Sequence, residues 1–278
     1  MAKSHLNILI PQWQGGGPDL SAYKGGQHLK SHYLKDVDFK EVEVRTDDLG
    51  EIKNNIAGYD EICEYLSRTK SLIDAQNPKT IFTIGGGCDV DIAQISYLNK
   101  AAGGDMTLLY FDAHGDLNTP ESSPSKYFFG MPLRTLLGDG DKNIIASLYS
   151  TLLPSQVIMF GVRDLDKPES EYIRKSDLRL LPVDEIEKDI SRVIGAAKEA
   201  GRDKIYIHID LDVLDPGEFP YSAIPVPGGL KNNTLARVLR DLNDEFEIIG
   251  LGLLEYSSSE DNENKLLKEI INIGADLE

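Results

Sequence analysis

The sequence predicts an α/β protein in which a mostly parallel sheet carries helices on both faces. Short apolar runs rich in β-branched residues alternate along the chain with segments whose apolar residues recur at helical spacing. Several of these runs are apolar without polar alternation, which is typical of strands covered on both faces. No internal repeat, low-complexity segment or flexible linker divides the 278 residues, so we expect a single domain over residues 1–278.

Eight apolar runs are the predicted strands, and helical periodicity is clearest in three of the segments between them. In a parallel sheet, ligands bind outside the carboxyl ends of the strands, so polar residues directly after the apolar runs are the candidates for a site. The strands are expected at 6–11, 42–45, 80–84, 106–111, 156–161, 179–182, 204–209 and 247–254, and the helices at 61–73, 184–201 and 233–242.

Charge and composition narrow the choice of partners. The chain has 29 Lys+Arg against 46 Asp+Glu, a net charge of −17, and so acidic a surface repels nucleic acid and anionic membranes. No apolar run approaches the roughly 18 residues of a membrane span, and the N-terminal run is too short for a signal peptide. The two cysteines, Cys63 and Cys88, make no disulfide framework. We expect a cytoplasmic protein that binds neither nucleic acid nor membranes, with Cys63 buried as a small apolar residue.

Three polar clusters directly follow predicted strands. In an extended segment, residues two apart point to the same side, so we expect the side chains to converge within the first two of these clusters, the one after 106–111 and the one after 204–209. Carboxylates gathered at one sheet edge repel one another unless divalent cations lie between them. Carboxylate and imidazole ligands suit Mn, Fe, Co, Ni or Zn, and the number of carboxylates favours two ions. The clusters are Asp112, His114 and Asp116 after 106–111, Asp210 and Asp212 after 204–209, and Cys88 and Asp89 after 80–84.

Other interpretations of these motifs account for fewer residues. DLDVLDPGEF misplaces the glycine and the distal glutamate of an EF-hand loop. It does resemble the D-x-D nucleophile segment of haloacid-dehalogenase phosphatases, but that interpretation leaves DAHGD without a role. GGGCDV has Val90 where a dinucleotide fingerprint has its third glycine, and it lacks the lysine of a P-loop.

Over nearly its whole length the chain resembles the ureohydrolase family of arginases, agmatinases and formiminoglutamases. DAHGDLNTP resembles the family's D-A-H-x-D motif, and DLDVLDP resembles its D-x-D-x-x-D-P motif. GLGLLEYSS ends a predicted strand on Glu255, as the family does, and GGGC stands where the family has G-G-D-H. The resemblance implies a three-layer α/β/α fold with an eight-stranded, mostly parallel sheet, and a homo-oligomer, either a trimer or a hexamer.

The resemblance also implies two manganese ions and a metal-bridging hydroxide that attacks a guanidinium carbon. Asp116 would hydrogen-bond that hydroxide and Glu255 would hold the guanidinium, which makes them the implied catalytic residues. Asn118, Ser125 and Asp166 would bind the amino-acid end of the substrate, although each is also a residue that turns commonly use. The implied metal ligands are Cys88, Asp112, Asp116 and Asp210 for one ion, and His114, Asp112, Asp210 and Asp212 for the other.

Three positions depart from the family's pattern. Cys88 replaces a ligand histidine. Because a thiolate is a softer ligand than imidazole, zinc, iron or cobalt are alternatives to manganese at that site. The other interpretation is that Cys88 is a buried structural thiol beside a single metal ion. Phe129 replaces a histidine that carries a proton, so substrates with a better leaving group than arginine's come into consideration, such as an N-hydroxyguanidine or a formimino compound. Ile224 replaces a threonine near the guanidinium end.

The first hypothesis is therefore a metal-dependent hydrolase of C–N bonds in a linear guanidino or amidino amino acid, releasing urea or a related product. Agmatinase, formiminoglutamase and N-hydroxyarginine hydrolase activities stay open beside it. Because two histidines of the family's pattern are replaced, the alternative is a member that has lost catalysis and binds a small-molecule ligand.

Overall fold

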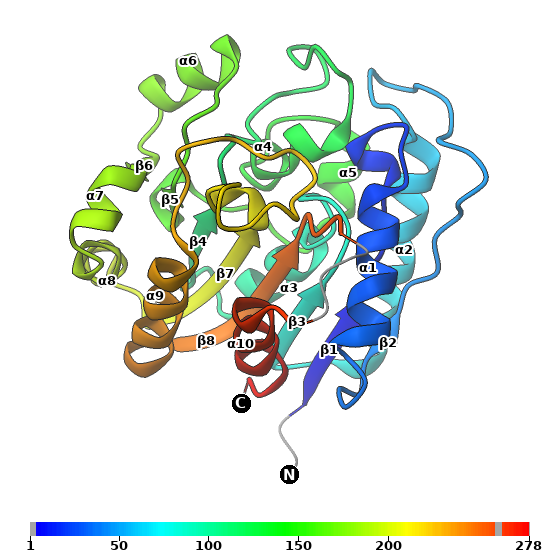
Figure 1. Ribbon diagram of the computed structural model, residues 1–278. Helices are drawn as coiled ribbons and strands as arrows, with labels where there is room; N and C mark the ends of the chain where they lie inside the picture. Colours follow the sequence, from blue (N-terminus) through cyan, green and yellow to red (C-terminus); the bar gives the residue numbers. More distant parts are fainter. Residues whose placement is uncertain (1–3, 259–262, 278) are drawn as a thin grey trace.

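The computed structural model describes residues 4–258 and 263–277 and arranges them in three layers (Figure 1). The middle layer is an eight-stranded sheet with the order β2-β1-β3-β8-β7-β4-β5-β6, and every pairing between the described strands is parallel. This confirms the predicted fold class. The strands are β1 His5–Leu9, β2 Lys40–Glu41, β3 Thr80–Ile84, β4 Thr107–Phe111, β5 Val157–Phe160, β6 Arg179–Leu181, β7 Lys204–Asp210 and β8 Glu247–Leu254.

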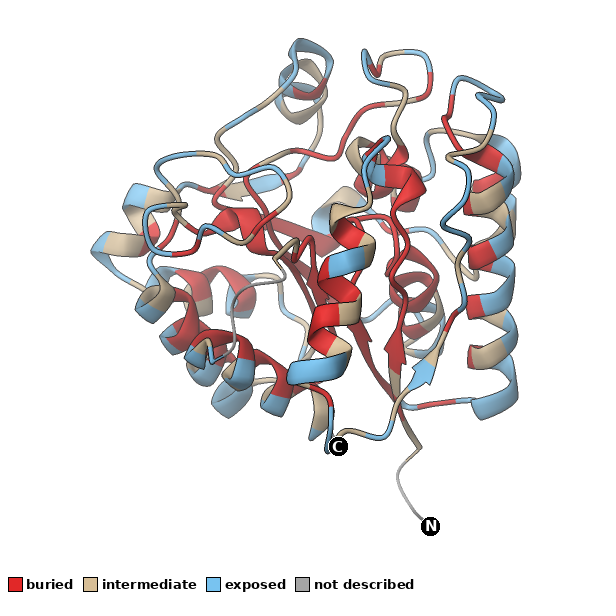
Figure 2. Cartoon of the chain, turned by 45° about the vertical axis from the view of Figure 1, so that its right-hand side comes forward, coloured by how far each residue is buried: buried red, intermediate tan, exposed pale blue. Residues whose placement is uncertain are grey.

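Helices cover both faces of the sheet, and the buried residues gather on the strands and on the inward sides of the helices (Figure 2). Two separate apolar clusters result, one on each face, which is why the strands read as continuous apolar runs. One face carries α1 Ser21–His32, α7 Val183–Lys188, α8 Ser191–Glu199, α9 Asn232–Glu245 and α10 Lys265–Ala275; the other carries α2 Tyr59–Gln76, α3 Ile92–Ala101, α4 Pro132–Leu136 and α5 Lys142–Ser147, with α6 Lys167–Lys175 packed at its margin.

Alternation along β7 decides which of its side chains can reach the carboxyl-end site. Ile205, Ile207 and Ile209 face the α9 layer and belong to its apolar cluster. Tyr206 packs into the opposite cluster, and His208 and Asp210, two and four residues later, point to that same side. The last residue of β7 therefore delivers a carboxylate to the edge where the strand ends, on the side of α2 and α3.

The second predicted strand, at 42–45, is wrong in position. The strand is β2, which covers only Lys40 and Glu41, and Val42 makes one more bond from its N–H to the Leu9 carbonyl at 2.9 Å. Beyond it the backbone leaves the sheet, because the Arg45 carbonyl accepts a hydrogen bond from Trp13 Nε1 at 2.7 Å. Apolar residues at 42 and 44 gave a strand pattern that this loop contact interrupts.

The predicted helix at 184–201 is two helices rather than one. Asp189 adopts an extended conformation (φ −156°, ψ 100°) between α7 and α8, and its carboxylate accepts hydrogen bonds from the Ser191 N–H and hydroxyl. Aspartate competes with the helix for backbone donors in this way, so it ends one helix and starts the next. Cys63 on α2 is only partly buried, at the margin of the core. Among the residues that the structure describes, no helix combines the length and apolar character needed to cross a bilayer.

Candidate metal centre

The sheet order places the predicted polar clusters side by side. β3, β8, β7 and β4 are consecutive neighbours, and their carboxyl ends meet at the same edge of the sheet (Figure 1). Cys88 follows β3, Glu255 follows β8, and the clusters at 210–212 and 112–116 follow β7 and β4. Segments more than a hundred residues apart in sequence thus contribute side chains to one site.

Glycines turn the chain from β3 into the site. Gly85 and Gly86 have φ of +87° and +70°, and a Cβ on Gly86 would lie 2.6 Å from the Ile10 carbonyl oxygen. The turn buries Cys88, whose Sγ lies 2.8 Å from Asp210 Oδ2 and 3.8 Å from Asp112 Oδ2. Asp89, predicted in the same cluster, points elsewhere and accepts a hydrogen bond of 2.6 Å from the Tyr65 hydroxyl.

The segment after β4 converges on the site through a turn, so the expected extended conformation of residues 112–116 is wrong. Asp112 Oδ1 accepts a 2.6 Å hydrogen bond from the His114 N–H, which folds the backbone back on itself. Asp116 has a φ of +53°, and its Oδ2 accepts a 2.6 Å hydrogen bond from the Tyr110 hydroxyl. A left-handed aspartate is uncommon and costs conformational energy, which its buried partner offsets.

Backbone amides hold one oxygen of each remaining aspartate and leave the other for the site. Asp210 Oδ1 accepts from the Asp212 N–H at 2.7 Å, and Asp212 Oδ1 accepts from the Ala113 N–H at 2.9 Å. Asp212 Oδ2 lies 2.8 Å from His114 Nδ1. Because a backbone N–H fixes Oδ1 of each carboxylate, Oδ2 points into the cluster. Hydrogen bonds to the atom that does not bind metal orient metal-binding carboxylates in the same way.

Three groups of side chains in the described residues have donor atoms within 4.8 Å of one another, close enough to hold metal ions. The first group contains three of the four residues predicted for one ion, with His208 present and Asp210 absent. The third contains three of the four predicted for the other, again without Asp210, which groups instead with Cys88. The groups are Cys88, Asp112, Asp116 and His208; Cys88, Asp210 and Glu255; and Asp112, His114 and Asp212.

The electrostatics of the cluster fit cations. No lysine or arginine of the described residues forms an ion pair with its carboxylates; only His114 does, with Asp112 and Asp212. Burial raises the pKa of Asp116 to about 7 and, together with nearby carboxylates, that of Glu255 to about 8. Burial by itself would lower the pKa of His114, but its two aspartate partners raise it to about 12. Buried charge of one sign with too little compensation is the arrangement that divalent cations stabilise.

Glu255 lies against the thiol side of the cluster. Its Oε1 accepts a hydrogen bond of 3.2 Å from the Cys88 N–H, and its own N–H donates to the Gly86 carbonyl at 2.9 Å. Its φ of +60° is a second left-handed, non-glycine backbone in the site. Strained residues of this kind persist where the surrounding structure determines them, and they cluster at functional sites.

The loop after Asp116 joins the start of α6 through a buried glutamate. Glu169 accepts from the Leu117 N–H at 2.9 Å and from the Asp166 N–H at 2.8 Å, and burial raises its pKa. Asn118 Nδ2 donates to Asp166 Oδ2 at 2.9 Å, so two of the three predicted substrate-binding residues lie together. Ser125 is exposed, and its hydroxyl accepts from the Tyr127 N–H; among the described residues it has no hydrogen bond to the other two.

Residues 19–273 match the sequence profile of the arginase family. The chain belongs to the arginase family. It is 28% identical over 254 residues to an arginase of Staphylococcus aureus (strain MRSA252), covering 84% of each chain. It is 34% identical over 180 residues to an N(omega)-hydroxy-L-arginine amidinohydrolase of Streptomyces lavendulae, covering 65% of this chain and 62% of that one. The protein is accordingly a hydrolase that acts on C–N bonds other than peptide bonds.

The fold is also that of solved arginases. The crystal structure of Entamoeba histolytica arginase in complex with L-ornithine superposes with a TM-score of 0.86 at 21% identity, covering 100% of this chain and 99% of that one. Proclavaminate amidino hydrolase from Streptomyces clavuligerus superposes with a TM-score of 0.71 at 21% identity, covering 97% of this chain and 88% of that one. Manganese as the metal, an oligomeric assembly and a cytoplasmic location stay predictions for this member of the family.

Two of the departures from the arginase-family pattern lie in segments next to the candidate metal centre. Phe129 is in a short 3-10 helix (Phe128–Gly130), and its Cβ lies 3.7 Å from the position that a Cβ on Gly87 would take. Ile224 is 38% exposed, and the residue before it, Ala223, donates its N–H to the Glu255 carbonyl at 3.0 Å. The Phe129 side chain thus lies near Gly87, and the backbone next to Ile224 contacts Glu255.

Sequence reasoning missed His208, although a signal for it exists. It lies two residues before Asp210 on β7, so strand alternation alone puts both on the same face. Tyr110 on β4 stands in the same relation to Asp112 and was missed for the same reason. Both side chains lie within a strand, close to its carboxyl end, whereas the candidate residues were sought in the segment that follows each strand.

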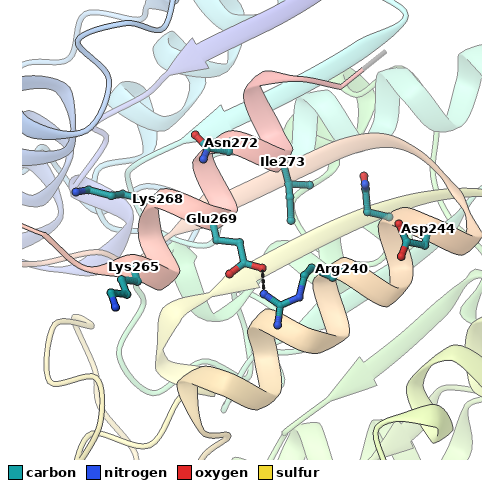
Figure 3. A pocket seen from close by; sticks show the side chains of 8 residues that line it. Arg240, Asp244, Lys265, Lys268, Glu269, Asn272 and Ile273 are labelled. Atoms are coloured by element: carbon teal, nitrogen blue, oxygen red, sulfur yellow. Dashed lines mark hydrogen bonds and ion pairs between the residues drawn. The ribbon is translucent and has the colours of Figure 1, made fainter.

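The groove between α9 and α10 is not part of this centre (Figure 3). Charged and polar side chains line it, and an ion pair of 2.5 Å between Arg240 Nη1 and Glu269 Oε1 spans it. Neither helix supplies a residue to the three donor groups. The groove is therefore separate from the candidate metal centre at the carboxyl ends of the strands.

Proposed function

We propose that the protein hydrolyses a guanidino or amidino amino acid and releases urea or a related product. The observation that carries the proposal is the shared position of Asp112, which belongs both to the group with Cys88 and to the group with His114 and Asp212. A carboxylate common to two donor groups is suited to bridging two cations. Two cations held in this way would lie near the buried Glu255, which would suit the hydrolysis of a cationic group.

The predicted ligand sets are our first assignment of the metal sites. Cys88, Asp112, Asp116 and Asp210 would hold one cation, and His114, Asp112, Asp210 and Asp212 the other. Manganese is the first metal to test, and zinc, iron and cobalt follow because a thiolate is softer than an imidazole. Bound divalent cations supply a water nucleophile near neutral pH by lowering the pKa of water.

The protein's own residues position the substrate and the proton. Glu255, held by the Cys88 N–H, would bind the guanidinium or amidinium through its second oxygen. Asp116, fixed by the Tyr110 hydroxyl, would accept a hydrogen bond from the attacking water. Phe129 offers no proton to the departing amine, so the structure favours a substrate whose leaving group needs less help, such as an N-hydroxyguanidine or formimino compound.

The Asn118–Asp166 pair would bind the amino-acid end of the substrate. An amide donor and an exposed carboxylate joined at 2.9 Å offer hydrogen bonds to a carboxylate and an ammonium group respectively. Agmatine, which lacks the carboxylate, would lose the contact to Asn118. This pair separates a substrate with an α-amino acid end from one without it.

The test is turnover of a substrate panel by protein loaded in turn with manganese, zinc, iron(II) or cobalt. The panel contains arginine, N-hydroxyarginine, agmatine and formiminoglutamate, and urea or the corresponding product is measured. We expect turnover of at least one amino-acid substrate, and slower turnover of agmatine than of arginine. Release of no product under any metal would refute the proposal, and tight binding without product would instead identify a non-catalytic member. An aryl phosphate with magnesium serves as the control for the phosphatase interpretation.

A further inference from the structure

His208 is a fully buried imidazole on the same face of β7 as Asp210. One of its ring nitrogens lies within 4.8 Å of donor atoms of Cys88, Asp112 and Asp116. The three remaining histidines outside the cluster are elsewhere: His5 bonds Thr80 and Asn7, and His28 and His32 stack on each other in α1. His208 is thus the only histidine near Cys88 besides His114 among the residues that the structure describes.

The surroundings of His208 fix the orientation of its ring. Asp91, at the start of α3, places Oδ2 3.0 Å from His208 Nδ1. Gly252, paired with His208 across β7 and β8, makes room for that carboxylate, since a Cβ there would lie 2.6 Å from Asp91 Oδ2. The Tyr110 ring stacks on the imidazole with centroids 3.8 Å apart and planes 8° apart. The Asp91 contact and the Tyr110 stacking therefore both restrain rotation of the ring.

The second ring nitrogen of His208 is left without a partner. A carboxylate only accepts hydrogen bonds, so Nδ1 is the donor to Asp91, and Nε2 has no hydrogen-bond partner in the described residues. Burying a polar atom without a partner is unfavourable, and structures avoid it unless a ligand satisfies the atom. A carboxylate that holds one nitrogen of a histidine, with the other nitrogen unpartnered and the ring beside anionic donors, is the arrangement typical of a metal-binding histidine.

We propose that His208 is a metal ligand and supplies the imidazole that Cys88 removes from the centre. The inference rests on the proposed metal centre and names one of its ligands. Cys88, Asp112, Asp116 and His208 then form a four-donor site of one sulfur, one nitrogen and two carboxylates. This donor set favours zinc, iron(II) or cobalt over manganese, because manganese prefers oxygen ligands. Asp91 is its positioning residue.

X-ray absorption spectroscopy of the zinc-loaded full-length protein tests the ligand directly. The key variant is His114→Ala, which removes the other histidine of the cluster. With one equivalent of zinc, we expect one sulfur at about 2.3 Å and a persistent imidazole scattering pattern in this variant. The double variant His114→Ala/His208→Gln is expected to keep the sulfur and lose the imidazole. A His114→Ala spectrum with sulfur but no imidazole would overturn the inference.

Affinity measurements provide a second readout that does not depend on correct folding of the variant that replaces the buried His208. Cobalt affinity is measured by titration, followed through the thiolate-to-metal absorption. We expect the affinity to fall by about 10–100-fold in Asp91→Asn, because the residue that hydrogen-bonds a ligand histidine contributes that much to metal binding. The matched control is His32→Gln on α1, which removes an imidazole remote from the cluster and leaves the affinity unchanged. Unchanged cobalt affinity in Asp91→Asn would contradict the positioning role.

These results separate the inference from the proposed function. Zinc bound through sulfur and imidazole by a protein that turns over no substrate would leave His208 a ligand and refute the hydrolase proposal. If the wild-type protein turns over substrate but its His114→Ala variant binds zinc without an imidazole, the hydrolase proposal stands and His208 is not a ligand.

Discussion

Replacing Asp212 by asparagine and by alanine separates two roles that the structure gives to one side chain. Asp212 is 1% exposed; its Oδ1 accepts the Ala113 N–H at 2.9 Å, and its Oδ2 lies 2.8 Å from His114 Nδ1. Asparagine keeps an oxygen for the Ala113 N–H but removes the negative charge. Alanine removes both. The difference between the variants therefore reports the backbone contact, and the change common to both reports the metal ligand.

The structure sets the size of each effect. Leaving the buried Ala113 N–H without an acceptor costs about 1–3 kcal/mol, so Asp212→Ala should unfold at a lower temperature than Asp212→Asn. For a chain of this size each kcal/mol shifts Tm by about 2–4 °C, which gives a difference of about 2–12 °C. Loss of the anionic donor should cost at least the about 1.5–3 kcal/mol of a hydrogen bond to a charged group. That is about a 10–100-fold weaker metal site in both variants.

The assays are differential scanning calorimetry of metal-free protein, and metal titration with hydrolysis rates measured at a fixed metal concentration. Asp164→Asn is the matched control, since Asp164 also approaches His114, at 3.9 Å, but its side chain is 66% exposed, and an exposed pair contributes little. Metal affinity and turnover close to those of the wild type in Asp212→Asn would refute the ligand assignment. Equal Tm values for the two variants would refute the structural role of the Ala113 contact.

Two further predictions follow from the same site. Phe129→His, which places an ionisable ring beside Gly87, should raise turnover of arginine relative to N-hydroxyarginine, by up to the about 10²–10⁴-fold that general-acid catalysis provides; an unchanged ratio of the two kcat values would contradict the account of the leaving group. Removing cations with a chelator should lower Tm and adding them back should restore it, because burial and neighbouring carboxylates raise the pKa of both Asp112 and Asp210, and His114 is the one basic partner of Asp112 among the described residues. Cations at 1,000 times their Kd add about 4 kcal/mol of stability. A Tm unchanged by chelator and by added metal would argue against a metal centre.

Much of the architecture follows from local pattern. The strands after Pro78 read as uninterrupted apolar runs because helices cover both faces of the sheet, and the structure has β3 to β8 at the expected places. Local chemistry also explains the errors. Asp189 broke a helix that periodicity predicted as continuous, and the loop contact of Arg45 shortened the second strand. A periodic pattern reports which side chains are apolar, and it does not register a single competing hydrogen bond.

The candidate site divides in the same way. The sequence by itself determined that acidic motifs follow strands and that a parallel sheet gathers its carboxyl ends at one edge. Only the tertiary structure decided that β8 inserts between β3 and β7, that Asp116 turns inward through a left-handed backbone, and that Asp91, just before α3, reaches His208 past Gly252. Spacing along the chain constrains side chains of one segment, whereas the distance between segments a hundred residues apart depends on strand order and on how the connecting helices cross the sheet.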